Sequence, residues 1–405
     1  MKVRLNLFHL MAGVYLLLDA LALAAHLLAL MGVIPFLPGL NWLRIHLLTI
    51  GVVVQMIVGT LPLLVRGPQS LKWPEESMTR VLWLLLNGSF VLLLYSMPAG
   101  LSILAAIAGT GIFVVIVLLL VTLFAPFQQK KRVTVEASLS RRFYLAGPFF
   151  FLVGILMALS MLLNWPAPGQ FFGLLEAHVH ANVWGFLALV VAGFLLEHLP
   201  AFAGQPLRWP ALVPATFWLL IVGATGLVAG PWLAMLPLTI VGIALYVVGT
   251  TLLLTNLGGT LLRARSWLPN LAHLVLAYLW MVVPAFVAPL TLMITGHLPT
   301  GRIESAAVSG LVAGWILQIV IGAFPLRLRE EKQIARGRDG WWISVGMLNI
   351  GVLALWILPF LPETASSFAE PVTILGYTLI ILSWLPPLLT VLSRVLSRRS
   401  VSLQE

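Results

Sequence analysis

The chain has 405 residues, of which 60% are hydrophobic and only 9% are charged, and its mean hydropathy is +1.05. Soluble domains carry about 45–50% apolar and about 25% charged residues, so this composition excludes a soluble enzyme and a disordered chain. It indicates an integral membrane protein. The lack of cysteine excludes disulfides, iron–sulfur clusters, haem thioethers and thiolate metal sites. The formal net charge of +10 is interpreted as a basic membrane face, not as nucleic-acid binding.

Long apolar runs recur along the whole chain. A helix that spans a bilayer needs about 20 mostly apolar residues. The sequence predicts twelve such spans, at residues 5–33, 43–65, 81–98, 100–126, 142–164, 171–199, 210–229, 232–256, 268–294, 303–326, 341–361 and 370–393. The first run follows Lys2 and Arg4, but it is longer than the roughly 7–15 apolar residues of a signal peptide. We therefore expect it to be the first span.

The basic residues test the number of spans. The two termini and the loops after even-numbered spans hold 21 of the 23 Lys and Arg residues, including runs at residues 130–132 and 327–338. Only Arg44 and Arg302 lie on the other side. Because basic residues concentrate on the cytoplasmic face, this asymmetry predicts a multi-pass protein of the inner (cytoplasmic) membrane, with both termini in the cytoplasm.

A threefold internal repeat predicts three pseudo-equivalent four-helix units within a single membrane domain, residues 1–405. The predicted repeats are about 1–135, 136–265 and 266–405, and their anchors in the second, sixth and tenth spans are His46, His180 and Ser309. Glycines follow each anchor at offsets of 5 and 13 residues, which places them on nearly one helix face. Small residues there let either a flat ligand or a neighbouring helix approach closely, and both interpretations stay open.

Equivalent residues also precede the anchors. His9, Tyr144 and His273 lie 37, 36 and 36 residues before the three anchors. His9 and His273 are expected near the cytoplasmic side, where a structural role is the default interpretation.

The segment Glu176–His180 carries the sharpest chemical signal. Ionisable groups inside a membrane are costly, so each one is a candidate functional residue. His178 and His180 are two residues apart, so they point about 200° apart on a helix and are expected to serve two different sites. Glu176 lies four residues before His180 and is expected to orient its imidazole. Asn182 is a further polar candidate beside them.

The second span offers a partner for His180. His46 is expected at a similar depth near the outer side, and two histidines from facing helices make an axial pair for a haem iron. Arg44 lies within a turn of His46 and is expected to pair with a haem propionate. Gly51 and Gly185, at the first glycine offset, are candidates for haem contact, and Gln55 is a candidate for the surrounding polar shell. The alternative is that these polar residues only hydrogen-bond helices together.

Asp19 lies within a leucine-rich part of the first span. It is interpreted either as a structural partner of His26 or another helix, or as part of a proton path.

The chain resembles subunit I of the haem–copper oxidases and nitric oxide reductases. The shared features are twelve spans, cytoplasmic termini, a pseudo-threefold pattern, and histidines on the second and sixth spans. The stretch from His178 through Gly193 is similar to their H-x-H haem helix, and more similar to the H-A-H-E-M…A-G-F-L-L segment of the NnrS family. His46-Leu-Leu-Thr-Ile-Gly also resembles an NnrS segment. NnrS proteins contain haem and copper and are linked to nitric oxide stress. The motifs cover about 40 residues.

The chain also differs from these families, and the differences limit which of their functions it is expected to share. The oxidases carry H-x-H on the tenth span, where this chain has Ser309, and they need an adjacent pair of histidines for copper, which this chain lacks. The NnrS-like segments come in the opposite chain order. A copper site and oxygen reduction at a haem–copper centre are therefore not expected.

The resemblance and the residues together predict a haem-binding membrane protein, active in electron transfer or in nitric oxide or oxygen binding under stress. It would hold one b-type haem at His46 and His180, or two if His178 holds a second one, and would work with a redox partner protein. A non-enzymatic role is favoured, and an enzymatic one would be that of a haem-dependent oxidoreductase. The alternatives are a haem-free transporter with a proton or metal path, and a cofactor-free respiratory scaffold.

Overall fold

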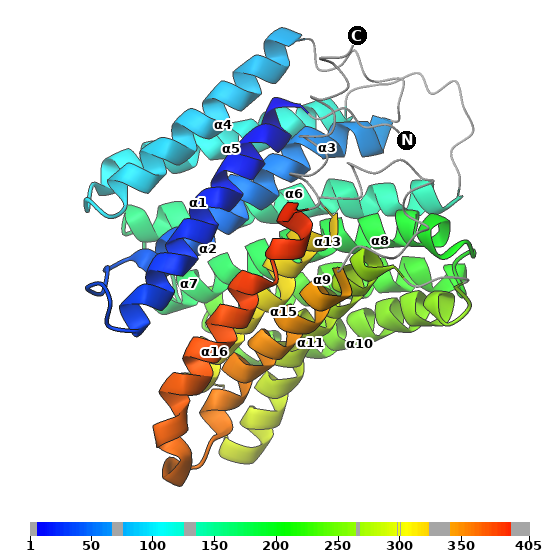
Figure 1. The fold of residues 1–405 in the computed structure, drawn as a ribbon. Coiled ribbons are helices and arrows are strands. Elements are labelled where there is room, and N and C mark those ends of the chain that lie inside the picture. Colours follow the sequence, from blue (N-terminus) through cyan, green and yellow to red (C-terminus); the bar gives the residue numbers. More distant parts are fainter. Residues whose placement is uncertain are drawn as a thin grey trace, which may run out of the picture. The chain divides into compact units, whose positions relative to one another are not determined.

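The computed structural model describes residues 6–66, 76–124, 135–264, 268–297, 299, 301–323 and 341–389, and every regular element among them is a helix (Figure 1). Within these residues, twelve helical segments are long and apolar enough to cross a membrane, which confirms the predicted number of spans. They are Leu7–Leu30, Leu40–Val65, Ser77–Ser96, Ser102–Phe124, Leu139–Leu162, Gln170–Ala203, Pro210–Trp232, Leu236–Leu261, Pro269–Thr295, Ala306–Ala323, Trp341–Phe360 and Ala369–Leu389.

The basic runs at residues 130–132 and 327–338, together with Lys2 and Arg4, lie outside the described residues. The orientation with both termini in the cytoplasm therefore stays a prediction.

Helix α1 (Leu7–Leu30) shows the reversed burial pattern of a membrane helix. Its leucines Leu10, Leu17 and Leu21 are exposed, whereas Asp19 and His26 are buried. Exposed leucines are favourable against lipid, but a charged side chain in hydrocarbon is not, so such groups turn toward the bundle interior. The polar face of α1 is thus the face that packs against the protein.

The chain divides into two compact units. Unit 1 comprises residues 56–265, and unit 2 comprises residues 2–55 and 266–405. The division after residue 265 coincides with the predicted boundary between the second and third repeats. The single membrane domain and the three four-helix units remain predictions.

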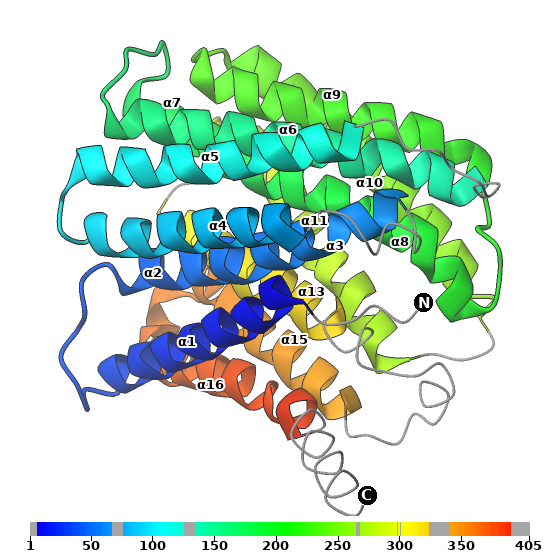
Figure 2. The same cartoon turned by 90° about the horizontal axis from the view of Figure 1, so that it is seen from above.

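Unit 1 is a bundle built around one long composite span. Its helices are α3 (Gln55–Arg66, from Met56), α4 (Glu76–Ser96), α5 (Ser102–Phe124), α6 (Val135–Leu162), α7 (Gln170–His180), η3 (Ala181–Leu187), α8 (Ala188–Ala203), η4 (Pro210–Leu212), α9 (Val213–Trp232) and α10 (Leu236–Leu261). Helix α6 packs against α5 and against the span formed by α7, η3 and α8, while α9 packs against α7 and α10 (Figure 2). A Cβ at Gly226 would lie only 2.7 Å from the Cα of Gly242, so glycines let α9 and α10 approach closely.

Unit 2 joins the start of the chain to its last third. Its helices are α1, α2 (Leu40–His46), η1 (Leu47–Val54), α11 (Pro269–Thr295), α12 (Arg302–Ser309), η5 (Gly310–Leu317), α13 (Gln318–Ala323), α15 (Trp341–Ile357), η7 (Leu358–Phe360), η8 (Glu363–Phe368) and α16 (Ala369–Leu382). Helix α1 packs against η1 and α16, and α11 packs against η5 and α13. Helix α15 packs against α16 and η5.

Three spans share an unusual backbone break. In each, an α-helix ends at a predicted anchor, His46, His180 or Ser309, and a π-helix begins at the next residue. The α-helical pattern resumes at Gln55, Ala188 and Gln318 after η1, η3 and η5. π-helices are rare and occur frequently at functional sites. The backbone therefore repeats locally at the three anchors.

The glycines five residues after the second and third anchors pack against the preceding span. A Cβ at Gly185 would overlap the ring of Phe150 on α6. A Cβ at Gly314 would lie 2.6 Å from the ring of Trp280 on α11. These positions therefore favour the helix-packing interpretation over contact with a flat ligand.

The glycines 13 residues after the second and third anchors also pack against a preceding span. A Cβ at Gly193 would lie 3.0 Å from Tyr144 Cε1, and a Cβ at Gly322 would lie 3.0 Å from His273 Cβ. The predicted equivalence of Tyr144 and His273 is therefore matched by equivalent glycine contacts, one in each unit.

Candidate functional site

Helix α7 is held against α9 at its first residues. The Gly169 amide donates a hydrogen bond to the Trp232 carbonyl oxygen at 2.8 Å. A Cβ at Gly173 would overlap the Pro231 carbonyl oxygen, so only glycine allows this approach. The contact sets the position of His180, at the last residue of α7, relative to α9.

His180 is fixed by the backbone of α9. Its Nδ1 lies 2.7 Å from the Leu227 carbonyl oxygen, and the Trp184 indole meets its ring edge-on at a centroid distance of 5.1 Å. A carbonyl only accepts hydrogen bonds, so Nδ1 must carry the proton and Nε2 of the neutral ring carries the lone pair. Metal-binding histidines are commonly oriented in this way. The side chain is half-buried.

His178 turns to the other side of the same span. Its Nδ1 lies 2.8 Å from the Gly154 carbonyl oxygen on α6. The Asn182 amide nitrogen lies 3.3 Å from both ring nitrogens of His178. The rings of His178 and His180 thus contact different helices, α6 and α9, while their service to two different sites stays a prediction. Because Asn182 can donate to the Nε2 lone pair of His178, His180 is the better metal ligand of the two.

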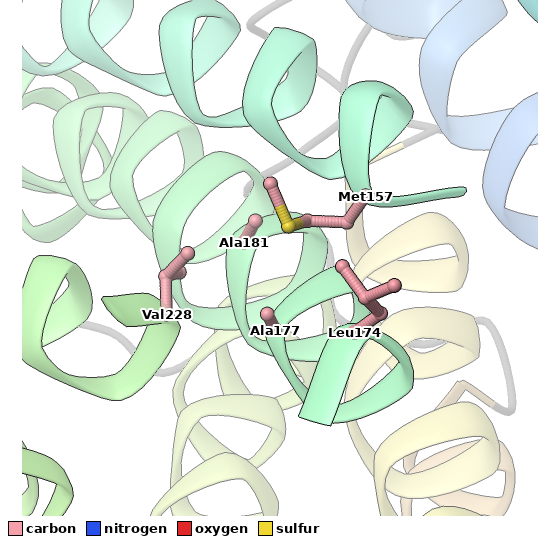
Figure 3. Packing of buried hydrophobic residues seen from close by; sticks show 5 residues of the cluster. All are labelled: Met157, Leu174, Ala177, Ala181 and Val228. Atoms are coloured by element: carbon pink, nitrogen blue, oxygen red, sulfur yellow. The ribbon is translucent and has the colours of Figure 1, made fainter. Parts of the chain in front are cut away.

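A small apolar cluster includes Ala177 and Ala181, the residues next to the two histidines in the chain. Figure 3 shows Met157 of α6 and Val228 of α9 packed around Leu174, Ala177 and Ala181 of the α7–η3 span. Ala177 and Ala181 are fully buried. Their small side chains let α6 and α9 approach the span from two sides, which brings the Gly154 and Leu227 carbonyls within reach of the two rings.

In unit 2, the His46 ring also contacts a main-chain carbonyl and a tryptophan, both of which belong to its own helix. Its Nδ1 lies 2.8 Å from the Trp42 carbonyl oxygen one turn earlier, and the Trp42 indole stacks on its ring at a centroid distance of 4.1 Å. The same argument places the proton on Nδ1 and the lone pair on Nε2. His46 is half-buried at the last residue of α2.

Arg44 is a buried cation in unit 2, with only 9% of its surface exposed. Its guanidinium lies 5.6 Å from the centroid of the Tyr377 ring on α16, and its Nε has no hydrogen-bond partner among the described residues. Asp19 and His26 on α1 lie within electrostatic range of Arg44. The His26 ring also meets Tyr377 edge-on at 5.0 Å.

The other predicted site residues lie close to these histidines in sequence. Glu176 is exposed, and the group that contacts His180 Nδ1 is the Leu227 carbonyl, so the orienting role of Glu176 stays a prediction. Gln55 is fully buried where α3 begins, and Gly51 is buried within η1.

The remaining histidines have other surroundings. His9 closes the capping box of α1 with Asn6, and His297 is exposed after α11. The His198 ring stacks on Phe194. His273 is fully buried and lies 3.2 Å from Ser344 Oγ.

Several neighbours of the histidines were not predicted. Trp42 and Trp184 lie four residues before His46 and four residues after His180, and this helical spacing could have identified both. The carbonyls of Leu227 and Gly154 act through the main chain, which has no residue-type signature.

No group of three or more His, Cys, Asp or Glu side chains within the described ranges is arranged to hold a metal ion. No known family model matches the chain, and no curated protein is similar to it.

Proposed function

We propose that this membrane protein binds b-type haem, with His180 as an axial ligand in unit 1 and His46 as an axial ligand in unit 2. The observation that supports this most directly is the pair of carbonyl contacts, from Leu227 and Trp42, that direct the protons to Nδ1. Each Nε2 is then the atom with a lone pair for iron. The pairing of the two on one iron stays a prediction, because they belong to different units.

The donor set suits haem better than a bare metal ion. A porphyrin supplies four equatorial nitrogens, so the protein needs to contribute only one or two imidazoles. Arg44, whose Nε lacks a described partner, suits a propionate that would complete its hydrogen bonding.

A bound haem iron would supply one-electron transfer, or gas binding where one axial position stays open. The carbonyls hold each imidazole in its ligating tautomer, and Trp42 and Trp184 restrict ring rotation. The proposed role is electron transfer with a redox partner, or nitric oxide or oxygen binding in a respiratory membrane. A second haem at His178 would have to displace the Asn182 contact.

The proposal is tested by absorption spectra of detergent-purified protein expressed with added haem. Loss of the sharp reduced α and β bands in both His180→Ala and His46→Ala variants is expected if both histidines bind one iron. His297→Ala, which removes an exposed histidine, should leave the spectrum unchanged. Loss of the bands in His178→Ala alone would move the site to the α6 side.

A second candidate is a haem-free transporter, favoured by the buried Asp19, His26 and Arg44 in unit 2. Three ionisable side chains in one bundle interior are typical of ion pathways. Proton-coupled uptake into vesicles that Asp19→Asn abolishes, in protein without any haem absorption, would favour this function. Without either property, the scaffold alternative would remain.

A further inference from the structure

The seam between α11 and α13 in unit 2 contains three fully buried polar side chains. Asn270 and His273 lie on α11, and Gln318 is the first residue of α13. Their exposed fractions are 1%, 0% and 0%. The proposed haem ligation uses none of them.

The three side chains face the same seam. A Cβ at Gly322 of α13 would lie 3.0 Å from His273 Cβ and 3.1 Å from the Asn270 carbonyl oxygen, so this face of α13 meets α11. Gln318 lies four residues before Gly322 and therefore on the same face. Asn270 and His273 are three residues apart and share a face of α11.

The protonation of His273 follows from its partner. The Ser344 hydroxyl donates to the Ser383 carbonyl oxygen at 2.7 Å, so its oxygen accepts from His273 Nε2 at 3.2 Å. Nε2 therefore carries the proton, and Nδ1 of the neutral ring carries a lone pair. This Nδ1 has no hydrogen-bond partner among the described residues.

Both side-chain amides in the seam also lack hydrogen-bond partners among the described residues. The side-chain oxygen and nitrogen of Asn270, and those of Gln318, have no hydrogen-bond partner in the described part of the chain. Exchanging oxygen and nitrogen within an amide does not help, because both ends lack partners. Buried polar groups are almost always hydrogen-bonded, to protein or to ordered water.

The mixture of groups identifies the ligand. The seam presents three acceptors, which are the two amide oxygens and the imidazole nitrogen, and two amide donors. A cation satisfies only the acceptors, and an anion satisfies only the donors. Water does both and typically bonds two to four polar groups. We propose that the α11–α13 seam binds a cluster of ordered water molecules that links Asn270, His273 and Gln318.

The corresponding seam of unit 1 has a different arrangement. There Gly193 packs beside Tyr144, whose hydroxyl donates to Glu197 Oε2 at 2.9 Å. A protein carboxylate thus accepts the hydrogen bond of the buried tyrosine. In unit 2 the water cluster would supply the missing partners and would give His273 a route for proton exchange.

Hydroxyl-radical footprinting of the full-length protein in detergent tests the water cluster. X-ray radiolysis of bound water oxidises the side chains beside it, even when they are buried. His273 is expected to be oxidised severalfold faster than Phe90, an equally buried side chain. Gln318→Leu should reduce the oxidation of His273, because it removes two of the groups that hold water. Oxidation of His273 no faster than that of Phe90 would overturn the proposal.

Asn349→Leu is the matched control. The Asn349 amide already accepts from Trp280 Nε1 and donates to the Val345 carbonyl, both at 2.7 Å, so its loss should leave the oxidation of His273 unchanged.

Thermal unfolding gives a second, independent result. In a hydrated seam Gln318→Leu lowers the melting temperature, because Asn270 and His273 lose their bridging water. In a dry seam the same change raises it, because a buried amide without partners is removed. A melting temperature that rises with added Na⁺ or K⁺ in the wild type but not in Gln318→Leu would assign the seam to a cation and overturn the proposal.

Discussion

His46, His178 and His180 each place Nδ1 against a main-chain carbonyl oxygen at 2.7–2.8 Å. At the residue scale, this contact has a chemical consequence, since it leaves the lone pair of a neutral ring on Nε2. The three residues were predicted from their types and spacing. Their tautomers were not, because the acceptors are peptide carbonyls and any residue type supplies one.

Tyr144→Phe tests a buried hydrogen bond at the same scale. The Tyr144 hydroxyl is buried and donates to Glu197 at 2.9 Å. Losing a hydrogen bond to a charged or polar buried partner is expected to cost about 1–3 kcal/mol of stability. Thermal unfolding in detergent measures the change. Tyr95→Phe, at an exposed position of α4, should stay within about 0.5 kcal/mol of the wild type. Equal effects of the two substitutions would contradict the assignment.

At the element scale, the sequence predicts the number of spans but not the π-helices within three of them. Apolar run length predicted all twelve spans, because a bilayer imposes a minimum length on each helix. The π-helices that follow His46, His180 and Ser309 were not predicted. Their sequences are ordinary apolar runs, and the break depends on partners elsewhere, such as the Tyr246 hydroxyl that donates to the Trp184 carbonyl at 3.0 Å.

The glycine pattern, too, could be predicted only in part from the sequence. The glycine spacing predicted a close approach to one helix face. It left open whether a ligand or a neighbouring helix makes that approach. The ring of Phe150 against Gly185 favours helix packing at that position. Only the structure identifies the neighbour, because it comes from a different span.

Gly173→Ala tests whether helix contact positions the histidine. The new methyl group would overlap the rigid Pro231 carbonyl and push α7 away from α9. We expect a loss of about 1–3 kcal/mol in stability and a lower haem content, although no histidine is changed. Thermal unfolding and the Soret absorbance per protein measure these two effects. Gly88→Ala, where an added Cβ meets no atom within 4 Å, is the control and should be neutral or stabilising by up to about 1 kcal/mol. If both variants behave alike, α7–α9 packing does not position His180.

At the scale of the whole molecule, twelve apolar helices establish a multi-pass membrane protein, while the direction of insertion rests on the basic residues. The loops that carry most of this signal lie outside the described residues, so orientation needs a direct measurement. The lack of cysteine in the chain makes single-cysteine labelling straightforward.

Phe36→Cys and Leu262→Cys place thiols at exposed positions after the first and the eighth span. With cytoplasmic termini, Phe36→Cys faces outward and should react with an impermeant maleimide in intact cells. Leu262→Cys should react only after the cells are permeabilised. The cysteine-free wild type gives the background. Reversed labelling would place the termini outside, and labelling of both in intact cells would mean an even number of spans between them, instead of the seven that the structure has.

The central claim, haem binding, is tested most directly by the reduced-minus-oxidised absorption spectrum of the wild-type protein, purified from haem-supplied cells. The account predicts a Soret band and sharp α and β bands on reduction, in folded protein with a fixed ratio of haem to chain. A folded, monodisperse preparation with no Soret band would contradict the account, and the buried Asp19, His26 and Arg44 would then make transport the better proposal.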